Sequence, residues 1–305
     1  MKKYKLTSES INVNYTKLYR IQALRSFGNV KEGDLGGFVQ SEDNLSHEGD
    51  AWISGNAKVF GNAEVYGNAW IFGDARIFGN AKVHENAEVY GNARVYGEAW
   101  ISGYARVYGN ARVYRTATVS KNAKVFGDAE VYGNAWIFGN AEVYGNTKVF
   151  GNAEVSGNAR VYEDAWVGVD VRVHENAEVY GNARVYGEAW ISGYARVHEN
   201  ARVYGNAKVH ENARVYGNTK VYGDAKVYEN IKISSNSDFI HIPKLSHWDI
   251  TITREYIKIG CKSYTYKEWK NFSDQEIDEM DENALDWWKI YKGLILESAK
   301  ILNKS

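Results

Sequence analysis

The stretch VYGNARVYGEAWISGYARV occupies residues 89–107 and recurs without change at residues 179–197. It belongs to a longer pattern in which an aliphatic residue stands at every sixth position from Ile53 to Ile233. These aliphatic positions number 31, and no insertion or deletion interrupts them. Ala precedes nearly all of them by two positions, and the exceptions are Thr147, Val171, Thr219 and Ile231. A short period repeated this often is typical of a solenoid, in which each unit stacks on the next.

The six-residue unit favours short strands over a helix. Gly and Asn recur along the pattern, and both are poor helix formers. In a strand, the Ala and Val of A-R-V-Y point to one side, while the Arg and Tyr point to the other. Gly followed by Asn suits a corner, because both residues tolerate positive φ. We therefore expect strands and corners to alternate, with Val and Ala stacked inside.

The unbroken hexads resemble the hexapeptide-repeat left-handed parallel β-helix superfamily. The resemblance covers residues 35–245 and is most specific over 53–233. It implies triangular coils built from three hexads each. The left hand follows from the resemblance alone, because the general crossover rule favours the right hand. The predicted fold class is therefore an all-β solenoid, a left-handed parallel β-helix of about ten 18-residue coils, with a small C-terminal α+β module.

The whole chain also resembles phage- and prophage-encoded YGNA repeat proteins of bacteria, which carry a polymer-forming or cytoskeletal-like label. Besides the repeat, the matching element is the leader LYRI.AL..FG.V..GDLGGFV at residues 18–39. This resemblance implies a phage or prophage origin and no defined chemistry.

Three segments are expected. Residues 1–34 form an N-terminal strand and cap segment, residues 35–245 the hexapeptide-repeat β-helix, and residues 246–305 a small α+β module that ends in a helix. Degraded hexads predict capping rungs before the first full coil, with the pairs Leu35 and Val39, Ser41 and Leu45, and His47 and Ala51. The glycines of GDLGGFV, at 33, 36 and 37, predict a tight turn onto that coil.

The C-terminal segment departs from the repeat. Alternating apolar residues over 248–269 predict two or three antiparallel strands. Ser273 followed by Glu276 matches a capping box and predicts the start of a helix. Cys261 is the single cysteine, and we expect a packed thiol there.

With eighteen residues per coil, the outward residues form three ladders. The first face has a basic column beside an aromatic column, which suits a nucleic acid or another polyanion through phosphate contacts and base stacking. The alternative is an aromatic ladder that protects the sheet, with Arg and Lys lying over the rings; the net charge of −1 lacks the basic excess of nucleic-acid binders. The candidate polyanion residues are Arg76, Arg94, Arg112, Lys148, Arg184, Arg202, Tyr96 and Tyr114. The second face mixes charges of both signs and needs no partner.

The third face replaces much of the tyrosine ladder by small polar residues, histidines and tryptophans. Tall and short side chains beside each other suit packing against another copy, and an exposed aromatic surface is unusual on a monomer. By resemblance we expect a homo-oligomer, with a trimer favoured. The candidate residues for this oligomer or ligand face are Trp100, Ser102, Ser120, Trp136, Phe138, Trp190, Ser192, His84, His174 and His210.

The main alternative is a hexapeptide-type acyltransferase or a decayed relative. The resemblance implies a His general base at a cleft between neighbouring subunits. Here no loop interrupts residues 53–233 to wall a pocket, and the HENA copies at 84, 174, 198 and 210 follow the duplicated sequence. We therefore expect no catalytic residues, no metal site and no cofactor.

The composition of the chain indicates the cellular compartment in which we expect it. One cysteine fits a reducing compartment, the opening MKKYKLTSES lacks the apolar run of a secretory signal, and no apolar stretch approaches the ~18 residues of a membrane span. We expect a protein of the bacterial host cytoplasm. The predicted function is a non-enzymatic, rigid binding or scaffold protein that engages a host macromolecule or sequesters a ligand.

Overall fold

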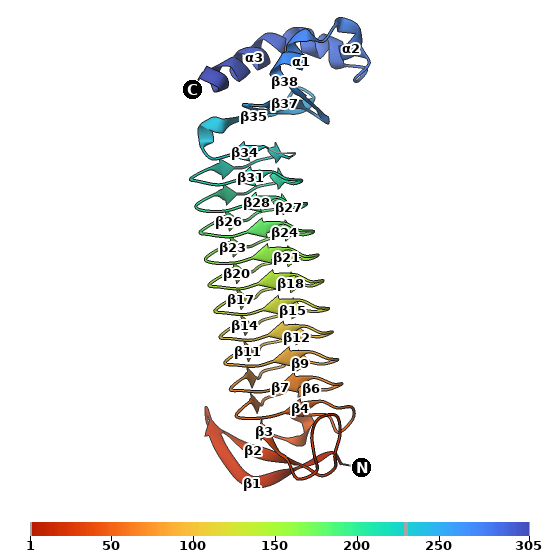
Figure 1. Ribbon diagram of the computed structural model, residues 1–305, viewed down its shortest axis with the longest axis vertical. Coiled ribbons are helices and arrows are strands. Elements are labelled where there is room, and N and C mark those ends of the chain that lie inside the picture. The colour runs from red at the N-terminus through yellow and green to blue at the C-terminus, as the bar shows by residue number, and fades with distance from the viewer. Residues whose placement is uncertain (1, 229–230, 305) are drawn as a thin grey trace.

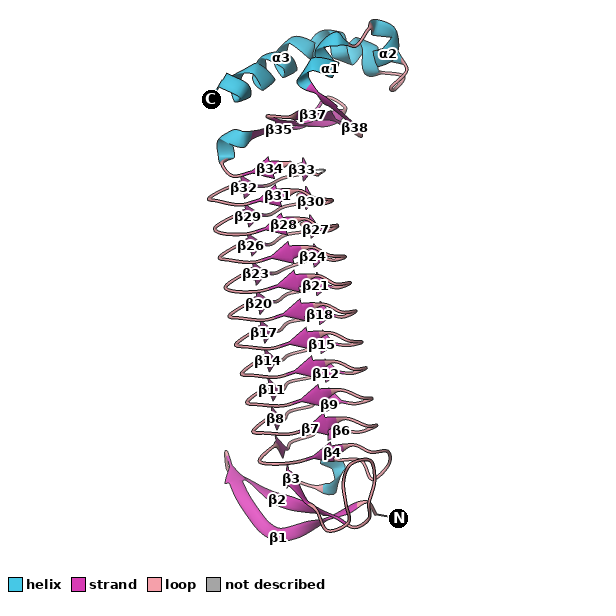
Figure 2. Ribbon diagram, viewed as in Figure 1, coloured by secondary structure: helices cyan, strands magenta, loops and turns pink. Residues whose placement is uncertain are grey.

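The computed structural model describes residues 2–228 and 231–304 and shows a long solenoid capped at both ends (Figure 1). Two-residue strands follow one another along its sides, from β4 to β34, and form three parallel sheets (Figure 2). The first sheet contains β5 Lys58–Val59, β8 Arg76–Ile77, β11 Arg94–Val95, β14 Arg112–Val113, β17 Glu130–Val131, β20 Lys148–Val149, β23 Trp166–Val167, β26 Arg184–Val185, β29 Arg202–Val203 and β32 Lys220–Val221.

The other two sheets follow the same rule. The second contains β4 Trp52–Ile53, β7 Trp70–Ile71, β10 Glu88–Val89, β13 Arg106–Val107, β16 Lys124–Val125, β19 Glu142–Val143, β22 Arg160–Val161, β25 Glu178–Val179, β28 Arg196–Val197, β31 Arg214–Val215 and β34 Lys232–Ile233. The third contains β6 Glu64–Val65, β9 Lys82–Val83, β12 Trp100–Ile101, β15 Thr118–Val119, β18 Trp136–Ile137, β21 Glu154–Val155, β24 Arg172–Val173, β27 Trp190–Ile191, β30 Lys208–Val209 and β33 Lys226–Val227.

The register confirms the eighteen-residue coil. Arg94 pairs with Arg112 and Val95 with Val113, and the same offset relates each later pair of strands. The Val, Ile and Ala side chains are buried in one continuous interior. Most corners have a glycine at positive φ, such as Gly91 at 68°. The predicted fold class, an all-β parallel solenoid with a small C-terminal α+β module, is confirmed.

The N-terminal cap covers the open end of the interior. β1 (Tyr4–Val13) and β2 (Thr16–Ala23) form a hairpin, and β3 (Leu35–Val39) links β2 to the solenoid by pairing with β5. The buried Lys3 ammonium donates to the Ala51 carbonyl at 2.8 Å, and the Asn44 side-chain amide, in the short 3-10 helix Glu42–Asn44, donates to the carbonyls of Gly61 and Ala63. The cap thus occupies carbonyls that a bare solenoid end would leave unpaired.

The predicted phase of the capping rungs is wrong by two residues. Val39 pairs with Val59 and Leu45 with Val65, an offset of 20, so both occupy the aliphatic position rather than the small one. Relative to the regular repeat, two extra residues lie between Leu45 and Ile53. The Ala51 carbonyl in this segment accepts the hydrogen bond from Lys3. The expected tight approach is present: a Cβ on Gly36 would lie 2.5 Å from the Ile53 carbonyl oxygen.

The C-terminal module has its own core. After a 3-10 turn at Asn236–Asp238, four antiparallel strands follow in order, β35 (Phe239–Leu245), β36 (Trp248–Thr253), β37 (Tyr256–Ile259) and β38 (Lys262–Thr265). Three helices follow at the end of the molecule, α1 (Tyr266–Asn271), α2 (Asp274–Asp278) and α3 (Ala284–Lys304) (Figure 1). Helices α1 and α3 pack on the sheet, and α2 packs on α3. Ser273 and Glu276 form the capping box at the start of α2. Within the described residues, none of these helices has the length and hydrophobicity needed to cross a bilayer.

One corner is strained. Val169 stands where most corners have glycine and adopts a φ of 68°, which is costly for a β-branched side chain. Its side chain is 45% exposed. We expect Val169→Gly to raise the free energy of unfolding by about 0.5–1 kcal/mol, the strain relieved minus the added backbone entropy of glycine. Denaturant unfolding measures this change, and the reverse substitution Gly127→Val, at a φ of 70°, should destabilise the chain.

Candidate functional site

The first face carries a stacked aromatic ladder. Phe78, Tyr96 and Tyr114 lie with ring centroids 4.8 and 4.9 Å apart and planes within 1° of parallel. Each ring covers the face of the next, so the ladder presents mainly ring edges to solvent. Base stacking on a strand of nucleic acid needs free ring faces. Within the stacked run, the aromatic column is therefore used to protect the sheet.

The basic column on this face has few acidic neighbours. Arg112 pairs with Glu130 at 3.1 Å. Arg94, Arg184 and Arg202 have no ion pair among residues 2–228 and 231–304, and Arg184 is the register partner of Arg202. Stacked like charges repel one another, so this face retains an unneutralised positive strip.

Opposite charges pair along much of the second face. Arg106 lies 3.2 Å from Glu88, Lys124 lies 3.0 Å from Glu142, and Arg196 lies 3.1 Å from Glu178. Alternation of charge along neighbouring coils offsets the repulsion that a single-sign column creates. Toward the C-terminal end of this face the alternation stops, because Arg196, Arg214 and Lys232 are successive register partners.

The third face presents tryptophans to solvent. Trp100 is 43% exposed and Trp136 is 49% exposed. Trp100 leans back one coil and meets His84 edge-to-face at 5.1 Å, and Trp190 meets His174 at 5.0 Å. The ninety-residue duplication therefore reproduces a His–Trp contact, which the residue spacing did not reveal.

Trp136 has different neighbours. Its ring packs on Phe138 at 4.8 Å, and its indole N–H points to the Ser120 hydroxyl at 3.4 Å. The structure thus brings Ser120, Trp136 and Phe138 together. Ser102 and Ser192 lie on the same face beside Trp100 and Trp190, with no side-chain hydrogen bond among the described residues.

The third-face histidines are half-buried, and the His210 Nδ1 atom lies 3.9 Å from the Glu211 carboxylate. Burial lowers the pKa of His84, His174 and His210, so the imidazoles are neutral near pH 7. The Nε2 atoms of His84 and His174 are buried without a hydrogen-bond partner. The adjacent carboxylates of Glu85 and Glu175 accept backbone N–H groups of the next coil, at 2.5 and 2.6 Å. A general base needs an oriented imidazole at its substrate, and no side chain among the described residues holds the Nε2 atom of His84 or His174 in this way.

No group of three or more His, Cys, Asp or Glu side chains that could hold a metal lies within the described part of the chain. His210 stacks on Tyr228 at 5.4 Å and His84 on Tyr66 at 4.7 Å, so these rings continue the aromatic column locally.

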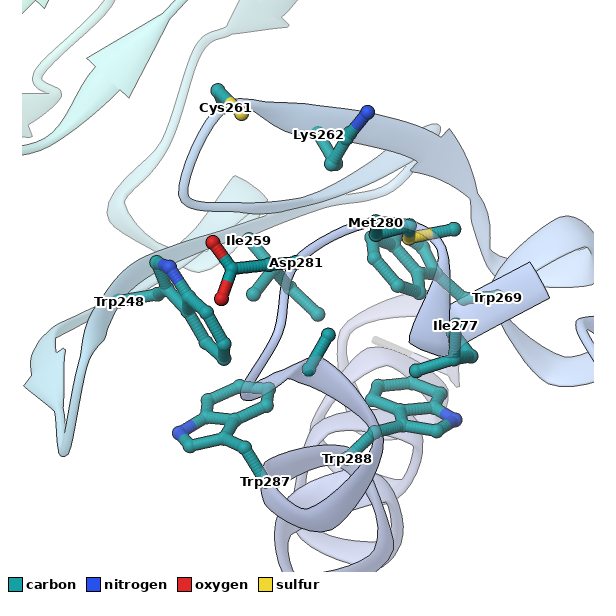
Figure 3. Close-up of a pocket in the computed structure, with 11 residues that line it drawn as sticks. Trp248, Ile259, Cys261, Lys262, Trp269, Ile277, Met280, Asp281, Trp287 and Trp288 are labelled. Carbon is teal, nitrogen blue, oxygen red and sulfur yellow. The ribbon is translucent and has the colours of Figure 1, made fainter. Parts of the chain in front are cut away.

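The C-terminal module contains a small apolar cavity of about 50 Å³ (Figure 3). Its walls include Trp248, Trp269, Trp287 and Trp288, with Asp281 at its edge. The volume suits a water molecule or two. Cys261 lies at the rim and is exposed, so the predicted packed thiol is wrong: the residue lies in the turn between β37 and β38.

Comparison with known proteins bears on the repeat. A family model described as "YdcK Beta solenoid repeat" matches residues 87–103, 105–121, 153–168 and 177–193. No curated protein sequence matches this chain. Among solved structures, LpxA from Acinetobacter baumannii is similar over 74% of this chain and 96% of its own, at 12% identity and a TM-score of 0.40. That likeness is too slight to carry an argument, and the fold rests on the strand register above.

Proposed function

We propose that this chain is a non-enzymatic, rigid scaffold that associates with copies of itself through its third face. In this account it is of phage or prophage origin and engages a host macromolecule or holds a ligand between subunits. The observation that carries the proposal is the exposure of Trp100 and Trp136 on one flat sheet. The resemblance of the leader and repeat to phage YGNA proteins supports the origin.

An interface on the third face would gain most of its free energy from the burial of aromatic side chains. Large aromatic side chains release the most apolar surface when a partner covers them, and tryptophan is enriched among the residues that dominate interface energies. Ser102 and Ser120 beside the rings leave room for side chains of another copy. The second face offers paired charges instead. A trimer remains the favoured assembly by resemblance to hexapeptide β-helices.

Sedimentation equilibrium tests the proposal. Combining Trp100→Glu with Trp136→Glu should weaken self-association by about 100-fold or more, because two desolvated aromatic anchors are replaced by charges. The matched control is Trp166→Glu, since Trp166 is 39% exposed but lies on the first face. Equal loss of assembly in the control, or no change in the double variant, would contradict the choice of face.

A second candidate is anion binding by the first face, supported by Arg94, Arg184 and Arg202 without ion pairs in the described structure. If a polyanion lies along this face, Arg94→Glu with Arg112→Glu should lower the salt concentration that elutes the protein from heparin. The slope of log affinity against log salt concentration should become shallower, by an amount equivalent to about one or more phosphate contacts. Unchanged elution would remove this candidate.

A further inference from the structure

The aromatic ladder of the first face is interrupted once. Rings stack from Phe60 to Phe150 and again from Tyr186 to Tyr222. Between Phe150 and Tyr186 the ring position is taken by Gly168. Coils repeat at about 4.8 Å, so the ring positions on either side are about 9.6 Å apart, twice a stacking distance. The gap therefore has the thickness of one aromatic ring.

The Phe150 ring turns into this gap and occupies the position of a Gly168 side chain. A Cβ on Gly168 would lie 2.2 Å from Phe150 Cζ, and the Phe150 ring has moved to 5.5 Å from Tyr132. A cavity of about 320 Å³ remains beside the ring, lined also by Trp166 and Tyr186. Tyr186 is 38% exposed, with no ring from the preceding coil stacked on it. We call this cavity the ladder notch.

The charges around the ladder notch are positive. Trp166 takes a position in the basic column and lies between Lys148 at 4.8 Å and Arg184 at 5.0 Å from its ring centre. Arg184 and Arg202 both line the notch, and neither has an ion pair within the described residues. Asp170, on the nearby corner, accepts a hydrogen bond from the Asn152 amide at 2.7 Å. The guanidinium groups of Arg184 and Arg202 are therefore available to bind an anion.

The strained corner lies at the same place. Val169, at a φ of 68°, lines the notch and follows Gly168 directly. The repeat thus departs from its pattern at two successive residues, one that removes a ring and one that costs backbone energy. Strain of this kind tends to gather at binding sites.

We propose that the ladder notch binds one small planar aromatic anion. The aromatic ring lies between Phe150 and Tyr186 and completes the ladder, and Phe150 returns toward Tyr132 to admit it. The anionic group, a phosphate or carboxylate, is bound by Arg184 and Arg202 through charge-assisted hydrogen bonds. Because the adjoining rings already stack on one another, the notch takes one ring and not a run of bases.

Calorimetric titration with adenosine 5′-monophosphate and 1-naphthyl phosphate tests this. At least one of them should bind at one site per chain. Adenosine and ribose 5-phosphate, which carry only the ring or only the anion, should each bind at least about tenfold more weakly than adenosine 5′-monophosphate. Failure of both aromatic phosphates to bind overturns the proposal.

Substitutions in the ladder notch test whether the ligand binds there. Gly168→Tyr fills the gap with a ladder ring and should abolish binding while the protein keeps its circular dichroism spectrum. Tyr186→Ala removes the platform, and Arg184→Gln or Arg202→Gln should each weaken binding about tenfold. The matched control is Arg94→Gln, in the same column but beside an unbroken ladder, and it should leave binding unchanged. Binding that survives Gly168→Tyr, or that falls equally in the control, places the ligand elsewhere and overturns the proposal.

A strand of nucleic acid is a separate outcome. If a single-stranded oligonucleotide binds more tightly than the mononucleotide and loses affinity equally with Arg94→Gln and Arg184→Gln, the first face binds a polyanion along its length. That result overturns the single-ring proposal.

Discussion

Replacing Val95 by Asp should lower the free energy of unfolding by at least about 4 kcal/mol. Val95 is fully buried and lies between Ile77 and Val113 in the first sheet. A carboxyl group there has only aliphatic neighbours and loses its hydration. Because each coil contacts only its neighbours, the damaged coil also uncouples the halves on either side. Guanidinium unfolding followed by circular dichroism measures the loss.

The control for this prediction is the adjoining residue. Arg94 belongs to the same strand but points outward, between Arg76 and Arg112. Arg94→Asp places an acid between two basic side chains and should change the free energy of unfolding by less than about 1 kcal/mol. If both substitutions cost the same, the inward and outward assignment of the solenoid is wrong.

Replacing Trp269 by Ala should cost about 3–5 kcal/mol and unfold the C-terminal module. Trp269 is buried, its indole N–H donates to the Ile257 carbonyl at 2.7 Å, and its ring packs on Trp288 at 5.1 Å. The module and the solenoid have separate hydrophobic clusters. We therefore expect hydrogen exchange to rise over the described residues 239–304 while the solenoid stays protected.

An exposed tryptophan provides the comparison. Trp166→Ala removes a ring of the same size from a half-open position on the solenoid and should cost about 1 kcal/mol or less. If Trp269→Ala instead unfolds the whole chain in one transition, the module and the solenoid form a single cooperative unit.

The repeat allowed the fold to be predicted because every hexad supplies the same evidence. Ala, Val and Gly recur in fixed order, so the interior, the outer columns and the corners follow from strand alternation and turn chemistry. The coil length came from resemblance, and the pairing of Arg94 with Arg112 confirms it. Before Ile53 the repeat is degraded, and two extra residues changed the register without a sequence signal.

Side-chain contacts between coils were harder to predict from the sequence. The columns showed that Trp100 and His84 share a face, but not that the indole leans back onto the imidazole. Gly168 stands out in the aromatic column, yet its consequence depends on where Phe150 turns and on whether Arg184 has a carboxylate partner. Such properties arise from rotamers and neighbouring charges, which a repeat pattern does not specify.

Self-association through the third face is the central property that we propose for this protein. Native mass spectrometry of the intact chain at micromolar concentration tests it most directly. The predicted result is an integer multiple of the 34.5 kDa chain, with three copies favoured, reverting to one copy when Trp100 and Trp136 are replaced by Glu. A wild-type chain that appears only at its single-copy mass would contradict the account.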